Sequence, residues 1–421
     1  MSVVSSVLSV NPRLIFLVVF VAVMAYLLYR DRDKVQRQSI LFYRRTKHGI
    51  EYIDRIANAA PRFWNIYGWT GVVFAFLTIP FILFNVLVSF SNMISSGGSS
   101  GGPSLVAPGL NSQASFQSGI SFIPIEYWLI SIAVLMFVHE LSHGIVARAE
   151  DMEINSVGWI VLGIIPGAFV EPKGENMLPG AEEDEDSDTG DEEDTNKGGP
   201  WDQGSWTSQL KVLAAGSFAN YVTAFIFALI SLGIFMQVAH PAGVVYSAQE
   251  GYPAVQSGMD NGTIYSINGE KVRYSDEIIA IAENFSANDT VTLNTSEGVF
   301  NVTMTDRNGS AYMGVLMGSG KGVMSAFYDM IYDRRVIKPA YEEVEGVLSW
   351  TLSMLQTVAL LNLLIGMFNM LPAKPLDGGQ IMGTLAERFL PEADGLLNYW
   401  SVLIWLALLG SILFSIATTV I

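Results

Sequence analysis

The chain of 421 residues contains no cysteine and only four histidines. The lack of cysteine excludes disulfide bonds and thiolate ligands, so any zinc ion would be held by histidine and carboxylate side chains. The scarcity of histidine draws attention to His139 and His143, because these two of the four stand four positions apart.

Charged residues are scarce as well, at 15% of the chain, whereas 50% of the residues are hydrophobic. This composition predicts a multi-pass membrane protein in a lipid bilayer rather than a soluble enzyme, and no nucleic-acid partner is expected. The net charge of −17 is concentrated, because residues 181–194 hold ten acidic residues and no basic one. Such a run repels itself and stays solvated, although it could also dock a basic partner or cations.

Hydrophobic windows predict about six transmembrane helices. They cover residues 13–29, 69–91, 122–148, 207–239, 347–371 and 397–420. The first is expected to be an uncleaved anchor, since it lacks a basic start and a convincing cleavage site. The apolar stretch 157–170 is short and broken by glycine and proline, which favours a re-entrant or interfacial segment.

The basic residues predict the orientation of these spans. Residues 30–68 carry nine Lys or Arg and residues 92–121 carry none, which places the former in the cytoplasm and the latter outside. Counting onward, the acidic loop 171–206 is cytoplasmic and 240–346 lies outside. Six Asn-x-Ser/Thr sequons all fall in that outer segment, which agrees with this topology without proving modification: Asn261, Asn284, Asn288, Asn294, Asn301 and Asn308.

The sequence His139-Glu140-Leu141-Ser142-His143 lies inside one of the predicted spans. Two histidines four residues apart project from one face of a helix and can share a zinc ion. Glu140 is then placed as a general base for the water at that ion. Ionisable residues at membrane depth are costly, so a functional metal site is expected here rather than a chance pattern.

A catalytic zinc usually takes three protein ligands, and Asp377 is the obvious third candidate. It belongs to the segment 369–379, NMLPAKPLDGG, which follows the fifth span and could also serve only as a span terminator with a turn. The third and fifth spans run in the same direction. His139 lies about 25 Å down its helix, a depth similar to that expected of Asp377, near the cytoplasmic side.

Two asparagines are further candidates for the site. Asn220 ends the pattern GSFAN at 216–220 in the fourth span, where small residues let helices approach closely. Its amide could pack between helices, or it could stabilise the oxyanion that forms when water attacks a carbonyl. Asn369 is a comparable candidate.

Together the motifs resemble the site-2 protease family of intramembrane zinc metalloproteases. The resemblance rests on HELSHG, GSFAN and NMLPAKPLDGG in that order, with GAFVEP at 167–172, and covers roughly residues 69–421. It implies a three-helix catalytic core, His139, His143 and Asp377 as zinc ligands, and Glu140 as base. It also implies a single-pass transmembrane protein as substrate, cleaved in regulated intramembrane proteolysis.

The outer segment 240–320 resembles a PDZ-like domain, on the pattern of residues 252–269 and on alternating strand-like stretches such as 290–304. Thr263 stands where such domains usually carry aspartate, which weakens any expectation of carboxylate binding. The domain could add a peptide strand to a sheet edge or exclude bulky substrates.

The predicted fold is therefore a multi-pass α-helical membrane protein with an inserted small β-rich PDZ-like domain. Its expected divisions are the anchor and basic segment 1–68, the first part of the protease core 69–239, the PDZ-like domain 240–320, a linker 321–346 and the second part of the core 347–421. Two alternatives stay open. One is a pseudoprotease that binds membrane helices or acts as a PDZ scaffold, and the other is a metalloprotease whose third ligand is a glutamate such as Glu171.

Overall fold

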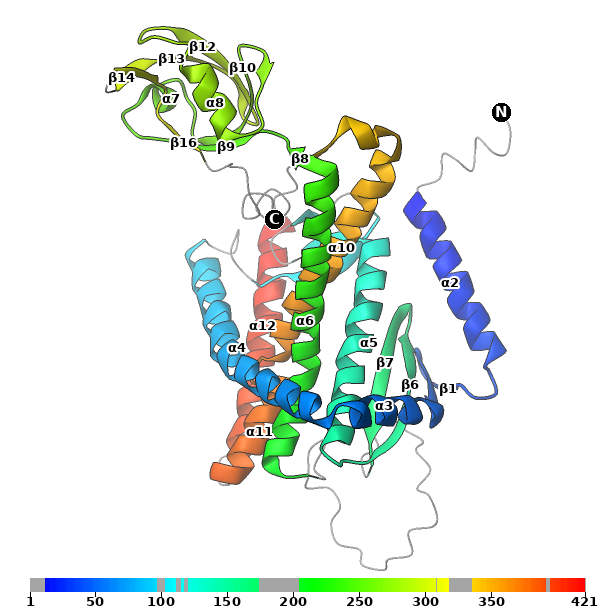
Figure 1. The fold of residues 1–421 in the computed structure, drawn as a ribbon. Helices are drawn as coiled ribbons and strands as arrows, with labels where there is room; N and C mark the ends of the chain where they lie inside the picture. Colours follow the sequence, from blue (N-terminus) through cyan, green and yellow to red (C-terminus); the bar gives the residue numbers. More distant parts are fainter. Residues whose placement is uncertain are drawn as a thin grey trace, which may run out of the picture. The chain divides into compact units, whose positions relative to one another are not determined.

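The computed structural model describes residues 12–96, 103–110, 115–116, 120–173, 204–307, 309–317, 335–390 and 394–420. The acidic run 181–194, the sequon at Asn308 and most of the expected linker 321–346 lie outside these ranges. The chain divides into two compact units, one formed by residues 1–227 with 357–421 and one formed by residues 228–356. Figure 1 shows the elements of both units.

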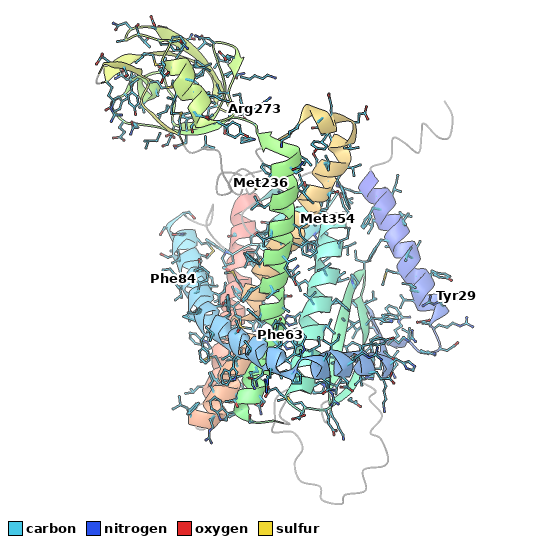
Figure 2. The ribbon with its side chains drawn as sticks, in the orientation of Figure 1. Tyr29, Phe63, Phe84, Met236, Arg273 and Met354 are labelled. Carbon is cyan, nitrogen blue, oxygen red and sulfur yellow. The ribbon has the colours of Figure 1, made fainter. Side chains whose placement is uncertain are left out.

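Six helices within the described ranges are long and apolar enough to cross a membrane, which confirms the predicted multi-pass helical fold. They are α2 (Pro12–Arg30), α4 (Pro61–Ser95), α5 (Ile125–Ala149), α6 (Trp206–Val238), α10 (Glu345–Asn369, preceded by the short helix Pro339–Val344) and α12 (Asp394–Val420). Large apolar side chains point away from α2 and α4 in Figure 2, as Tyr29, Phe63 and Phe84 show, and these three side chains are 68%, 55% and 65% exposed. Such apolar surface suits contact with lipid.

The segment 157–170 is not helical but forms most of a β-hairpin. Strands β6 (Ile154–Leu162) and β7 (Ile165–Pro172) pair antiparallel, and β2 (Leu41–Thr46) with β1 (Gln36–Gln38) extends the sheet in the order β1-β2-β6-β7. A hairpin of two strands alone would leave unpaired backbone groups along both of its edges. The N-terminal hairpin β1–β2 supplies hydrogen-bond partners along one of these edges. No pattern in residues 30–68 predicted these two strands.

Helix α3 (His48–Ala59) contacts both α5 and strand β6 of this sheet. Ile53 and Ala57 are buried on it, and Asp54 forms an ion pair with Arg148 near the end of α5. The side chains of Ile53 and Ala57 belong to a hydrophobic core built from α3, α4, α5, α6 and the β6–β7 hairpin. The basic segment 30–68 is therefore part of the packed unit and not a loose loop.

A separate three-stranded sheet precedes α5, formed by β3 (Leu105–Gly109), β4 (Ser115–Phe116) and β5 (Ile120–Pro124) in the order β3-β5-β4. Helix α5 begins directly after Pro124, with Glu126 in its first turn and Arg148 in its last turn. These charges match the partial charges at the two ends of a helix.

The second unit contains the ends of α6 and α10 and a small β-rich domain, inserted in sequence between those helices. Five of its strands form the sheet path β13-β12-β10-β9-β16, with β11 paired to β10. The unit's strands are β8 (Ala239–Pro241), β9 (Val244–Ala248), β10 (Asn261–Ile267), β11 (Glu270–Lys271), β12 (Thr290–Thr295), β13 (Gly298–Thr303), β14 (Thr305–Arg307), β15 (Ser310–Tyr312), β16 (Val315–Met317) and β17 (Arg335–Ile337), with helices α7 (Pro253–Gln256) and α8 (Ser275–Ala282).

Alternation along the strands explains the core of this β domain. Val291 and Leu293 of β12 are fully buried, whereas the intervening Thr292 is exposed. The five sequon asparagines that the structure describes are all exposed. The prediction of an inserted β-rich domain is confirmed, and its exact limits at 240 and 320 stay a prediction.

Candidate metal centre

Helix α5 holds His139 and His143 one turn apart, on the same face and inside the first unit. The two side chains are almost fully buried, and their imidazole rings lie edge to face with centroids 4.6 Å apart. The two Nε2 atoms are 3.1 Å from each other. This distance between two imidazole nitrogens is better explained by a shared metal ion than by a direct interaction between the two rings.

Asp377 arrives at the same place from the start of α11 (Asp377–Phe389). Its Oδ2 lies 3.4 Å from Nε2 of His139, and its Oδ1 lies 3.7 Å from Nε2 of His143. Helix α10 ends at Asn369, because Pro372 and Pro375 in the following turn cannot continue it. The chain therefore reverses sharply and begins α11 with the aspartate.

Two glycines make this sharp reversal possible. A Cβ atom at Gly378 would lie 2.7 Å from the carbonyl oxygen of Leu371, and one at Gly379 would lie 2.6 Å from that of Ala373. Both are collisions with backbone, which cannot move aside as a side chain can. The Asp-Gly-Gly sequence thus brings the carboxylate to the histidines by allowing the turn to pack against the helix.

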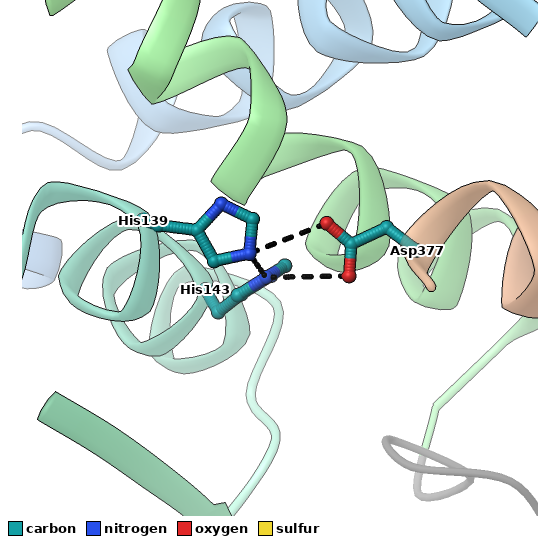
Figure 3. A group of neighbouring side chains, drawn as sticks. All are labelled: His139, His143 and Asp377. Atoms are coloured by element: carbon teal, nitrogen blue, oxygen red, sulfur yellow. Dashed lines mark hydrogen bonds and ion pairs between the residues drawn. The ribbon is translucent and has the colours of Figure 1, made fainter. Parts of the chain in front are cut away.

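The three side chains fit the ligand set of a zinc ion, as Figure 3 shows. Their donor atoms all lie within 4.8 Å of one another, and all three residues are buried. A tetrahedral ion with ligands at about 2.0 Å places neighbouring ligand atoms about 3.3 Å apart. The two Nε2 atoms are 3.1 Å apart, and the carboxylate meets them with different oxygens, Oδ2 at 3.4 Å from His139 and Oδ1 at 3.7 Å from His143.

Helix α6 fixes the orientation of both imidazoles. Nδ1 of His143 lies 2.7 Å from the carbonyl oxygen of Val212, to which it donates its proton, so that Nε2 is the nitrogen that carries the lone pair a metal would bind. The amide of Asn220 lies 3.1 Å from Nδ1 of His139, and the buried Oδ1 of Asn220 has no other partner among the described residues. A half-turn of that amide lets Oδ1 accept the Nδ1 proton, which again leaves Nε2 for the ion.

Gly216 and Ser217 of α6 complete the surroundings of the ligands. A Cβ atom at Gly216 would lie 2.7 Å from Cε1 of each histidine. Ser217 donates a hydrogen bond of 3.3 Å to Oδ2 of Asp377. Sequence reasoning singled out the GSFAN pattern but saw Gly216 only as a packing residue and missed Ser217. It also missed the carbonyl of Val212, because every residue carries a backbone carbonyl and the residue type does not show which one will bind a side chain.

Asn369, the last residue of α10, also reaches the ligands. Its Nδ2 lies 3.2 Å from Nε2 of His139 and 3.5 Å from Oδ2 of Asp377. The amide N–H groups therefore point to the place where the ligand atoms converge. Of the two candidate asparagines, Asn369 lies on the Nε2 side of His139, whereas Asn220 lies on its Nδ1 side.

Glu140 follows His139 on α5 and faces strand β7. Its Oε2 accepts a hydrogen bond of 3.2 Å from the backbone N–H of Val170, and the side chain is only partly buried. Glu171, the alternative third ligand, does not join the histidines. Its side chain is fully buried and accepts hydrogen bonds from Arg45 and Ser156.

Comparisons with known proteins agree with this architecture. A family model described as Peptidase family M50 matches residues 127–409. An uncharacterized protein of Methanocaldococcus jannaschii is 22% identical over 424 residues, which cover 94% of this chain and 97% of that protein. A Clostridium perfringens protein named "Putative zinc metalloprotease" is 24% identical over 321 residues, which cover 63% of this chain and 88% of that protein.

One solved structure is also similar, the PDZ domain of the SdrC-like protein of Listeria monocytogenes. It is 24% identical, covers 18% of this chain and 87% of its own length, and has a TM-score of 0.17, which is too low to carry an argument. The family match is of another kind, because it extends from α5, which carries both histidines, past Asp377 and into α12. The chain belongs to Peptidase family M50.

Proposed function

We propose that this chain is an intramembrane zinc metalloprotease that hydrolyses a peptide bond within or near the transmembrane helix of a membrane-anchored substrate. One observation carries the proposal. His139, His143 and Asp377 form a buried group whose possible ligand atoms lie within 4.8 Å of one another, and Glu140 stands beside it, in a bundle of apolar helices. The name of the Clostridium perfringens relative is in accord with this activity.

The residues have separate tasks in this mechanism. Zinc, when bound, polarises the scissile carbonyl and lowers the pKa of a water molecule. Glu140 takes a proton from the attacking water and passes it to the amide nitrogen, so that the C–N bond breaks and a carboxylate and an amine are released. The carbonyl of Val212 and the amide of Asn220 keep the two imidazoles in the tautomer that ligation requires.

Asn369 is the donor we assign to the oxyanion. Its Nδ2 lies within 3.5 Å of ligand atoms from both His139 and Asp377, so a carbonyl oxygen held between them would lie within its reach. A donor already aimed at the position where negative charge develops needs no reorganisation during the reaction. Asn220 serves instead as a positioning residue for His139.

The surroundings of the site support the proposed substrate class. Because the ligands lie inside a bundle of apolar helices, we expect the peptide to enter from the membrane and its helix to unwind locally to present a carbonyl. We infer a single-pass transmembrane protein, cleaved in regulated intramembrane proteolysis. The excess of basic residues in 30–68 supports a site near the cytoplasmic side and an extracytoplasmic β domain.

The test measures zinc content and cleavage together in detergent-purified protein. The probe is a designed single-span peptide with an apolar segment of about 20 residues, interrupted by a central Gly-Pro pair. Wild type should hold one zinc per chain and cleave the probe. Glu140→Gln should keep the zinc and lose cleavage, whereas Asp377→Ala should lose both.

Two results would contradict the proposal in different ways. Cleavage by Glu140→Gln at the wild-type rate would remove Glu140 from its role as base. A folded wild type that binds zinc but cleaves no membrane-spanning probe would favour the alternative, a pseudoprotease that binds membrane helices.

A further inference from the structure

Strand β7 is the element that holds Glu140 from outside its own helix. The backbone N–H of Val170 donates to Oε2 of Glu140 over 3.2 Å. The side chain of Val170 also packs close to α5, since a Cβ at Gly144 would lie 3.3 Å from its Cγ atoms. The position of β7 therefore decides where one oxygen of this carboxylate lies.

A buried ion pair holds β7 at the next residue. Nε and Nη2 of Arg45 each donate a hydrogen bond of 3.1 Å to a different oxygen of Glu171. Ser156 on β6 donates a third, of 2.6 Å, to the same carboxylate. Glu171 has no exposed surface, whereas the side chain of Arg45 is 17% exposed. A two-bond pair of this kind fixes both the distance and the orientation of its partners.

The arginine reaches this pair across an intervening strand. Arg45 on β2 stands opposite Gly158 of β6, and Glu171 on β7 stands opposite Ser156 of β6. Gly158 makes room for the ring of Phe169 on β7, because a Cβ there would lie 2.6 Å from that ring. The guanidinium of Arg45 lies 5.2 Å from the centre of the Tyr43 ring. Nη1 of Arg45 also donates a hydrogen bond of 3.0 Å to the side chain of Gln36.

We propose that Arg45 is a positioning residue for Glu140. It acts through Glu171 and the backbone of β7, although it lies in the N-terminal hairpin and outside residues 127–409, which the family model matches. The inference rests on the proposed function of Glu140 as the base. It gives the N-terminal segment a task that its charge alone did not suggest.

The physical reason is the cost of an unpaired buried carboxylate. Without Arg45, the buried carboxylate of Glu171 loses two of its three hydrogen bonds and its charge partner, which is strongly destabilising and favours a shift of β7 that brings Glu171 to water. Val170 would move with its neighbour, and the hydrogen bond to Glu140 would lengthen or break. Displacement of a reacting group by about 1 Å costs up to about a hundredfold in rate.

The chain offers a matched control in the adjacent arginine. Arg44 lies on the same strand but pairs with Asp31, at the end of α2, and not with β7. The experiment compares Arg45→Gln, Glu171→Gln and Arg44→Gln in the full chain. It measures zinc per chain, kcat and KM on the designed single-span peptide, and hydrogen exchange of the backbone over residues 165–172.

Arg45→Gln and Glu171→Gln should keep one zinc per chain, lower kcat about tenfold or more with KM little changed, and speed exchange in 165–172. Arg44→Gln should resemble wild type in all three measurements. Equal kcat and equal exchange in Arg45→Gln and Arg44→Gln would overturn the proposal.

Two further results remain decisive. If Arg45→Gln fails to fold, Arg45→Lys keeps the charge but not the paired geometry, and a kcat equal to that of Arg44→Lys would overturn the proposal. If wild type binds zinc but cleaves nothing, the proposed protease function fails. The exchange of 165–172 then decides alone whether Arg45 holds β7 against Glu140.

Discussion

Gly216→Ala is the substitution whose effect the structure determines most directly. The added Cβ would lie 2.7 Å from Cε1 of His139 and 2.7 Å from Cε1 of His143. Carbon atoms pack at about 3.5 Å or more, so the rings or α6 must move by roughly 0.8 Å. Ligand distances in a metal site tolerate about 0.2 Å, and both ligands are displaced at once.

We therefore expect Gly216→Ala to weaken zinc binding by about 10- to 100-fold, the range seen when the support of a ligand is disturbed. This range corresponds to about 1.4 to 2.8 kcal/mol. The assay is competition for zinc against a chromophoric chelator in detergent. Gly233→Ala is the control, because it lies on the same helix and a Cβ there meets no atom within 4 Å.

The comparison of the two variants distinguishes an effect on the zinc site from a general effect of alanine on the helix. Alanine is favoured over glycine in a helix by about 1 kcal/mol, so both variants should gain in helix stability. Only Gly216→Ala should lose zinc. Equal zinc affinity in the two variants would refute the view that Gly216 makes room for the imidazoles.

Two more predictions concern other parts of the first unit. Asn369→Ala should keep zinc and lower kcat by about a hundredfold, since it removes the proposed oxyanion donor. In the control Asn362→Ala, on the same helix, the measured zinc content and kcat should both be unchanged. An unchanged kcat in Asn369→Ala would contradict the assignment. Lys211→Met should lower thermal stability by about 3–5 kcal/mol, because the Glu150 carboxylate, 10% exposed, loses its ion-pair partner. Stability should recover in the double variant with Glu150→Met, and a single variant as stable as wild type would show that the pair contributes nothing.

The sequence predicted the six spans because each is a long apolar run, and such a run is a local property. It also predicted the order and direction of the spans well enough to expect His139 and Asp377 at one depth, and the structure brings these residues together. The boundaries were less exact: α4 begins at Pro61 and not near 69. The first turns of α4 hold aromatic and polar residues that a hydropathy window undervalues.

The segment 30–68 shows where sequence reasoning stopped. Its many Lys and Arg residues indicated a cytoplasmic loop, but it forms β1, β2 and α3 and packs into the core. Strand β2 pairs with β6, more than a hundred residues away in the chain, and no local pattern encodes a partner so distant. The same holds for Arg45 and Glu171, which are both ordinary charged residues until the sheet forms.

The sequence by itself determined the chemistry of this protein: the spans, the two histidines on one helical face, the carboxylates at Glu140 and Asp377, and the absence of thiolate ligands. Only the tertiary structure decided that Asp377 and not Glu171 joins the histidines, that Asn220 and Asn369 contact different nitrogens of His139, and that Arg45 of the N-terminal hairpin bonds to the strand that contacts Glu140. Residue type and helical spacing are fixed along the chain, whereas distances between separate helices and strands arise only when their side chains pack.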